Sequence, residues 1–249
     1  MIVLVTGASS GFGAAIARIF VGAGHRVIAA ARRTDRLQSL ADALGPALLP
    51  ITLDLCEQAR LSKLPESLPC DFAGVDVLVN NAGLALDLVP AHQAQLDDWQ
   101  TMINTNISGL VHITHAFLSG MVQRNRGHIM NIGSIAGSYP YPGSNVYGAT
   151  KAFVRQFSLN LRADLAGTAL RVTNIEPGLC GGTEFSRVRF KGDIEKASAP
   201  YQGTQPLSAE DIAELVYWAA TRPAHVNINT LEVMPVAQSF GAFRIHRKP

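Results

Sequence analysis

The chain has 249 residues, of which 47% are hydrophobic and 16% are charged, a balance typical of a compact globular protein and not of a disordered one. Its formal net charge is +2 and its lysines and arginines are scattered, so no basic run indicates a nucleic-acid partner. No apolar stretch approaches the roughly 20 residues of a membrane span, which excludes a helical membrane protein.

Short β-branched runs alternate along the chain with amphipathic helical stretches, a pattern typical of a parallel sheet covered by helices. Strands are predicted at Ile2–Val5, Arg26–Ala31, Leu48–Thr52, Val75–Val79, Gly127–Ile132, Leu170–Ile175 and Thr230–Val233. Helices are predicted at Phe12–Ala23, Asp35–Leu44, Glu57–Leu68, Leu96–Val122, Asn145–Leu165 and Ala209–Thr221. We therefore expect an α/β fold, a Rossmann-type doubly wound parallel sheet in three layers, as one domain over residues 1–249.

The segment Gly178–Leu207 is rich in glycine, proline and charge, and no strand is predicted in it. A stretch of that length in a compact domain is more often a lid or a binding loop than filler, so we expect a substrate lid over about residues 178–207. Ser208 and Asp211 form a capping-box pattern at the start of the last helix. Residues 236–249 are expected to form a C-terminal tail.

Cellular location is indicated by the first residues and by the cysteines. The apolar start Ile2–Val5 is too short for a signal peptide and lacks a basic leader. The three cysteines are odd in number and form no CxxC pair, which fits a reducing compartment. We therefore expect a cytoplasmic protein.

A glycine-rich turn follows the first strand and opens the first helix. Glycines there permit a tight turn and let backbone N–H groups approach a pyrophosphate at the positive end of the helix. Many such turns bind nothing, but the strand–turn–helix context favours a dinucleotide site. The candidate cofactor-binding residues in this turn are Gly7, Ser9, Ser10, Gly11, Phe12 and Gly13.

The end of the second strand indicates which dinucleotide is bound. An NAD site places a carboxylate about 20 residues past the glycines, where it binds the ribose 2′-hydroxyl. This chain instead has Arg32 and Arg33, and its first acid is Asp35. Paired guanidiniums attract the 2′-phosphate of NADP, so we expect NADP as the cofactor. The alternative is that both arginines are solvated side chains at a helix start.

Tyr147 and Lys151 lie four residues apart, a spacing that places both side chains on one face of a helix. A phenol ionises near pH 10, so it needs help to act as a base at neutral pH. A cation roughly 5 Å away contributes about 3 kcal/mol at an effective dielectric near 20, which predicts a pKa lowered by about two units. Ser134 lies thirteen residues before Tyr147.

Together these motifs resemble the short-chain dehydrogenase/reductase family over nearly the whole chain, which implies that residues 1–249 form a single dinucleotide-binding and catalytic domain. The resemblance also rests on Asn80-Asn81-Ala82-Gly83, Asn106 and Pro177-Gly178. It implies that Tyr147 exchanges a proton with the substrate oxygen, that Ser134 binds that oxygen, and that Lys151 lowers the phenol's pKa. It further implies that Asn106 holds a water linked to Lys151. The remaining cofactor contacts that it implies are Asp54, Leu55, Asn81, Ala82, Gly83, Pro177, Gly178, Leu179 and Thr183, together with Tyr147 and Lys151.

Within this family, the stretches Val146–Leu161, Glu176–Phe185 and Ala224–Pro235 resemble the bacterial NADP-dependent 3-hydroxy acid dehydrogenases. These enzymes are also described as serine or allo-threonine dehydrogenases and as malonic semialdehyde reductases. The resemblance implies interconversion of short 3-hydroxy and 3-oxo acids by a homotetramer. The alternatives are an enzyme of the family with another carbonyl substrate, such as a 3-ketoacyl thioester or a sugar, and a cofactor-sensing protein without the reaction.

An acid substrate needs a cation for its carboxylate, ideally an arginine. The expected lid offers Arg187, Arg189 and Lys191, and the tail offers Arg244, His246 and Arg247. We predict that Arg187 serves this role, a solvated surface charge being the alternative. No metal site is expected, because His112 and His115 share a helical face without a further ligand.

Overall fold

The computed structural model describes residues 1–241, and within them seven strands form one sheet. The strands lie in the order β3-β2-β1-β4-β5-β6-β7, and every neighbouring pair is parallel. Because the strand order reverses at β1, the sheet is doubly wound, and the predicted Rossmann-type fold is confirmed. The strands are β1 (Ile2–Thr6), β2 (Arg26–Ala31), β3 (Leu48–Thr52), β4 (Val77–Asn80), β5 (His128–Ile132), β6 (Arg171–Pro177) and β7 (Thr230–Val233).

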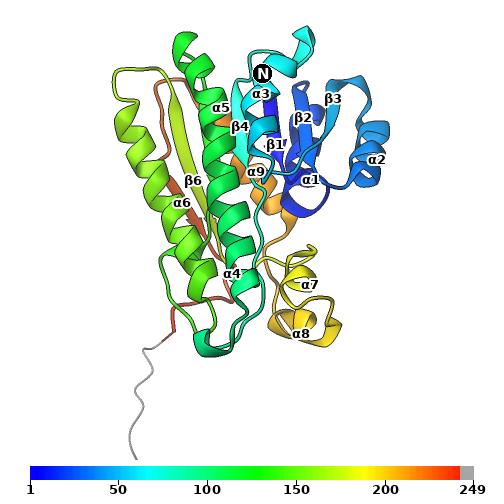
Figure 1. Ribbon diagram of the computed structural model, residues 1–249, viewed down its shortest axis with the longest axis vertical. Helices are drawn as coiled ribbons and strands as arrows, with labels where there is room; N and C mark the ends of the chain where they lie inside the picture. The colour runs from blue at the N-terminus through cyan, green and yellow to red at the C-terminus, as the bar shows by residue number, and fades with distance from the viewer. Residues whose placement is uncertain (242–249) are drawn as a thin grey trace, which may run out of the picture.

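Helices cover both faces of this sheet and give the three layers (Figure 1). They are α1 (Gly11–Gly22), α2 (Thr34–Leu44), α3 (Gln58–Ser67), α4 (Leu96–Ile103), α5 (Leu110–Gln123), α6 (Asn145–Asp164), α7 (Phe185–Arg189), α8 (Ile194–Ser198) and α9 (Ala209–Ala220). Helices α1, α2 and α9 pack on one face, and α3, α5 and α6 pack on the other. Among the described residues, no helix is long and apolar enough to cross a membrane.

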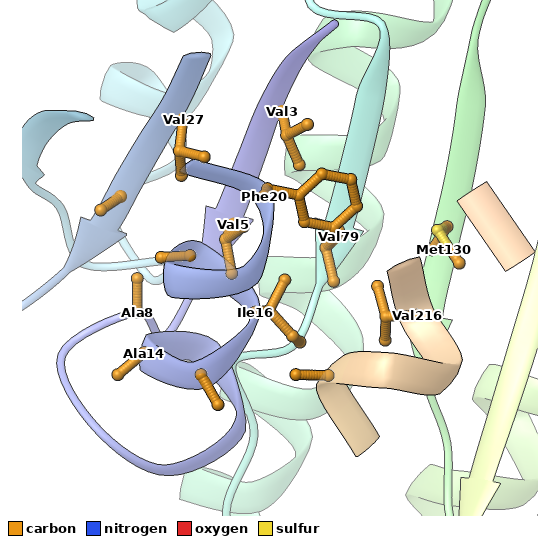
Figure 2. Close-up of a cluster of buried hydrophobic side chains, with 14 of the residues drawn as sticks. Val3, Val5, Ala8, Ala14, Ile16, Phe20, Val27, Val79, Met130 and Val216 are labelled. Carbon is orange, nitrogen blue, oxygen red and sulfur yellow. The ribbon is translucent and has the colours of Figure 1, made fainter. Parts of the chain in front are cut away.

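The alternation of side chains along the strands builds two cores. In β1, Val5 points to the core under α1 and α9, whereas Leu4 belongs to the core under α3, α5 and α6. Figure 2 shows Phe20 of α1 beside Val3 and Val79, and Val216 of α9 beside Val79 and Met130, all on the first side. Phe20 is fully buried, which contributes roughly 1.5–3 kcal/mol. These cores hold the carboxyl ends of the strands in a fixed arrangement.

The stretch predicted as one helix at Leu96–Val122 is interrupted by a π-helical turn. Helix α4 continues into this turn at Asn104–Gly109, and α5 follows it. A π-turn inserts one residue into the helical repeat and is frequent at functional sites. Here it contains the buried side chain of Asn106.

The segment 178–207 contains α7 and α8, which its composition does not predict. Each has five residues, too few for a periodic pattern to appear in the sequence. The Asp193 side chain caps α8 by accepting a hydrogen bond from Lys196 N at 3.1 Å. Both helices lie at the end of the sheet towards which the strands run (Figure 1). The predicted capping box of α9 is confirmed, with Ser208 N donating to Asp211 at 2.7 Å.

One buried histidine ties the stability of this fold to pH. His128 is 2% exposed, and its Nε2 lies 2.8 Å from the Thr173 hydroxyl. Burial, aided by the charge of Arg171, lowers the pKa of His128 to about 3. Between that value and the ordinary pKa near 6.5, the unfolded chain binds a proton that the folded chain does not, so stability falls as the pH falls through this window.

We expect His128→Gln to remove this dependence. In urea unfolding between pH 6.5 and 4.5, the free energy of unfolding of the wild type should fall more steeply than that of the variant, by up to about 1.4 kcal/mol per pH unit. His115→Gln, a change of an exposed histidine on α5, is the control and should keep the wild-type slope. An unchanged slope in His128→Gln contradicts the prediction.

Candidate active site

A cavity of about 650 Å³ opens at the carboxyl ends of the strands, beside the reversal of strand order at β1. This is where open α/β sheets bind ligands, and the volume suits a cofactor together with a small substrate. Of the predicted site residues, those that line it are Gly7, Ser9, Ser10, Gly11, Phe12, Arg32, Arg33, Asp54, Leu55, Asn81, Ala82, Gly83, Ser134, Tyr147, Lys151, Pro177, Gly178, Leu179 and Thr183. The predicted residues outside the lining are Gly13, Asn106 and Arg187.

The glycine turn is held against the loop that follows β4. Gly7 has a φ of +67°, a conformation that favours glycine. Position 13 has no room for a Cβ, because a Cβ on Gly13 would lie 2.7 Å from Asn81 Nδ2 and would meet the Gly7 carbonyl. Asn81 Nδ2 in turn donates to the Thr6 carbonyl at 2.8 Å, and the Thr6 hydroxyl accepts from the Asn81 and Ala82 backbones. No pattern in the sequence indicates that Thr6 links the glycine turn to the loop after β4.

The start of α1 fits an anionic group. Its N-cap residue Ser10 makes no side-chain capping bond, and the first turn contains no acid. The first backbone N–H groups of the helix therefore face the cavity mouth without an intrahelical partner, at the positive end of the helix dipole. This arrangement fits the pyrophosphate of a dinucleotide.

Arg33 lies between the glycine turn and the segment 178–207. Its guanidinium donates to the Ser10 hydroxyl at 2.7 Å and to the Ser9 hydroxyl at 3.1 Å. It also forms an ion pair of 2.8 Å with Glu184, whose pKa is lowered chiefly by this contact. Arg33 is thus not merely a solvated side chain: it places a positive charge beside the turn and contacts the predicted lid.

Tyr147 and Lys151 both lie on the buried face of α6, as their spacing predicts. The Lys151 ammonium lies 5.9 Å from the centre of the Tyr147 ring and donates a hydrogen bond of 2.8 Å to the Ile132 carbonyl at the end of β5. Ser134 follows that strand; its hydroxyl accepts a hydrogen bond of 3.1 Å from Ala136 N, and its side chain lies close enough to the Tyr147 phenol to lower that group's pKa. Two neighbouring elements, β5 and α6, therefore bring the three side chains together at one point of the cavity.

The predicted lowering of the phenol's pKa is wrong for the protein by itself. Burial raises the pKa of Tyr147 to about 12, and the opposing effects of the Ser134 hydrogen bond and the Arg189 charge are smaller. Burial also lowers the pKa of Lys151 to about 8. Because the interior disfavours the charged form of both groups, desolvation outweighs the attraction expected from their spacing.

Asn106 supports the cavity from behind. Its Oδ1 accepts from Leu84 N at 2.9 Å, and its Nδ2 donates to Leu84 O at 2.8 Å and to the Thr150 hydroxyl at 3.0 Å. The π-turn thus ties the loop after β4 to α6, one residue away from Lys151. Asn106 holds the geometry of the site without facing the cavity.

The segment 178–207 places a different arginine in the cavity from the one predicted. Arg187 is exposed and lies outside the lining, whereas Arg189 lines the cavity beside Tyr147. Lys191 forms an ion pair of 2.7 Å with Asp98. The tail candidates Arg244, His246 and Arg247 lie outside the described residues. Among the residues that the structure describes, no cluster of His, Cys, Asp or Glu could hold a metal ion.

The glycine turn at a helix N-terminus, the group of Ser134 with the buried Tyr147 and Lys151, and the doubly wound sheet define a nicotinamide-dependent oxidoreductase. The family model of the short chain dehydrogenases matches residues 1–193, and the chain belongs to this family.

Particular relatives match over the whole chain. It is 64% identical over 247 residues to the NADP-dependent 3-hydroxy acid dehydrogenase of Salmonella typhi, covering 99% of this chain and 100% of the relative. It is 51% identical over 246 residues to serine 3-dehydrogenase of Agrobacterium fabrum, covering 99% and 98%. The solved closed form of a serine dehydrogenase complexed with NADP⁺ superposes with a TM-score of 0.98 at 61% identity, and both chains are covered in full.

Proposed function

We propose that the protein is an NADP-dependent oxidoreductase that interconverts short 3-hydroxy acids and their 3-oxo acids. The single observation that carries the proposal is the phenol of Tyr147, buried beside Ser134 and Lys151 in the same cavity as the glycine turn. The names of the full-length relatives support both the cofactor and the class of substrate. Within that class we propose malonic semialdehyde and 3-hydroxypropionate, L-serine and L-allo-threonine.

Each polar side chain of the group has a chemical role in this proposal. Tyr147 removes the proton of the substrate hydroxyl in oxidation and returns it to the carbonyl oxygen in reduction. Ser134 donates a hydrogen bond to that oxygen, where negative charge develops. Lys151, whose pKa is lowered to about 8, holds a proton close to the phenol and binds the cofactor ribose. Asn106 holds the loop that follows β4 in place against α6.

The residues of the cavity fit NADP along its length. The glycine turn and the start of α1 would hold the pyrophosphate, and Arg32 and Arg33 the 2′-phosphate. Asp54 and Leu55 would border the adenine, and the segments 81–83 and 177–183 the rest of the cofactor. When bound, NADP accepts a hydride from substrate C3 or returns one to it, while the protein exchanges the proton.

A panel of substrates assayed by absorbance, with NADP and NAD in parallel, tests this function. We expect oxidation of L-serine, L-allo-threonine and 3-hydroxypropionate with NADP, and kcat/KM at least about tenfold lower with NAD, because NAD has no 2′-phosphate for Arg32 and Arg33 to bind. A 3-ketoacyl thioester, assayed in the reducing direction with NADPH, and a sugar serve as comparison substrates. Turnover of either one in place of all three acids would overturn the proposal.

We also propose a homotetramer in the cytoplasm, with the segment 178–207 acting as a substrate lid. The two long helices α5 and α6 expose the apolar side chains Val122, Phe153 and Leu159. Exposed apolar side chains of this kind favour burial against another copy of the chain. The contact between Glu184 and Arg33 supports a lid that closes against the cofactor site.

A further inference from the structure

The guanidinium of Arg189 lies in the cavity and contacts two aromatic rings and one hydroxyl group. It is the last residue of α7, and its guanidinium carbon lies 5.0 Å from the centre of the Tyr147 ring and 5.2 Å from the centre of the Phe185 ring. One Nη donates a hydrogen bond of 3.0 Å to the Tyr141 hydroxyl. Two aromatic rings and a hydroxyl therefore fix a planar cation, and one of the rings belongs to the proposed proton donor.

The same guanidinium retains unused hydrogen-bonding capacity. Its Nε is buried and has no hydrogen-bond partner among the described residues. No acidic side chain of residues 1–241 forms an ion pair with it, in contrast to Arg33, Arg155 and Lys191. A buried N–H donor without an acceptor, on a cation without a counter-charge, is costly for a protein to maintain. An anionic acceptor that enters the cavity removes both costs.

We propose that Arg189 is the group that binds the substrate carboxylate. This inference rests on the proposed function, which supplies an acid with its hydroxyl on C3. Only C2 separates the reacting C3 from the carboxylate carbon, so the carboxylate has to lie directly beside the Tyr147 phenol. Arg189 faces that ring, and the planar fork of Nε and Nη matches the two oxygens of a carboxylate.

The position of Arg189 also sets the length of the substrate. Tyr141 and Phe185 hold the guanidinium in place, and the backbone carbonyl of Arg189 accepts a hydrogen bond of 2.8 Å from Asp87 N. A fixed distance between phenol and guanidinium selects hydroxyl and carboxylate groups with a fixed separation. Acids with the hydroxyl one carbon further away therefore lose one of the two contacts.

The test compares Arg189→Gln with the matched control Arg187→Gln, both assayed as full-length enzyme with saturating NADP. The substrates are 3-hydroxypropionate and its uncharged amide, 3-hydroxypropionamide. In Arg189→Gln we expect kcat/KM for the acid to fall about 100-fold, mainly through KM, and kcat/KM for the amide to change less than about threefold. Arg187→Gln should leave both values unchanged. Arg189→Lys keeps the charge and loses the fork, so it should lose about tenfold on the acid alone.

The two proposals fail in distinguishable ways. An equal loss on acid and amide in both Arg189 variants overturns the carboxylate role and leaves Arg189 as a structural residue. A wild-type preference for the acid that survives in Arg189→Gln overturns the role while the proposed function stands. A wild-type enzyme that turns over neither 3-hydroxypropionate nor L-serine overturns both. If Arg189→Gln no longer binds NADP, Arg189→Lys with the same two substrates decides.

Discussion

Tyr147→Phe is expected to abolish turnover while NADP binding persists. The change removes one hydroxyl and keeps the ring, which packs against Phe185 with a centroid separation of 5.8 Å and faces the Lys151 ammonium. Without the hydroxyl, the variant lacks the group that, in the proposed function, exchanges a proton with the substrate oxygen. General acid–base catalysis contributes roughly 10²–10⁴-fold, so kcat should fall by several orders of magnitude.

Two measurements separate chemistry from binding in this variant. Steady-state oxidation of L-serine reports kcat, and quenching of protein fluorescence reports the dissociation constant of NADP, which should stay within about threefold of the wild type. Tyr217→Phe removes a phenolic hydroxyl from α9, where the ring packs against Phe20, and should leave both values unchanged. Near-normal kcat in Tyr147→Phe would refute the assigned role.

Gly13→Ala is expected to disrupt the cofactor site from within the protein. The added Cβ would lie 2.7 Å from Asn81 Nδ2 and 2.8 Å from the Ala8 Cα, and it would meet the Gly7 carbonyl. Two of these three neighbours are backbone atoms, so α1 or the glycine turn has to move. Overpacking of this kind costs about 1–3 kcal/mol. The movement also displaces the N–H groups that would bind the pyrophosphate, and NADP affinity should fall roughly 10–100-fold.

The same helix provides the control for this change. Nothing lies within 4 Å of a Cβ added at Gly22, so Gly22→Ala should leave NADP affinity unchanged and add about 0.5–1 kcal/mol of stability through better helix propensity. Urea unfolding and an NADP titration on both variants measure the two effects. Wild-type affinity in Gly13→Ala would show that the close contact relaxes at no cost to the site.

The fold could be predicted from the sequence because its signals are local and repeated. Alternating residues such as Leu4 and Val5 sort themselves onto the two faces of β1, and glycines mark the turn at the strand's end. The parallel arrangement then brings the ends of distant strands to one edge, which is why residues as far apart as Gly7 and Ser134 share a cavity. Arg32 and Arg33 indicated NADP, in agreement with the NADP-dependent relatives.

Other features depended on tertiary contacts that no local pattern encodes. Arg187 and Arg189 are two residues apart in a five-residue helix, and the one that faces the cavity is decided by contacts with Tyr141 and the Asp87 backbone. The pKa of Tyr147 could not be predicted from its spacing to a lysine, since the depth of burial decides the sign of the shift.

The hydrogen bond from Asp87 N to the Arg189 carbonyl has one more consequence. This bond connects α7, which contains Arg189, to the loop after β4 and not to a strand of the sheet. If, as proposed, the segment 178–207 is a lid and Arg189 binds the carboxylate, an outward movement of the segment moves the guanidinium away from an anionic product as the cavity opens. Under these two proposals, opening of the cavity and release of the carboxylate occur in one movement, so tight binding of a small acid does not slow the release of the product.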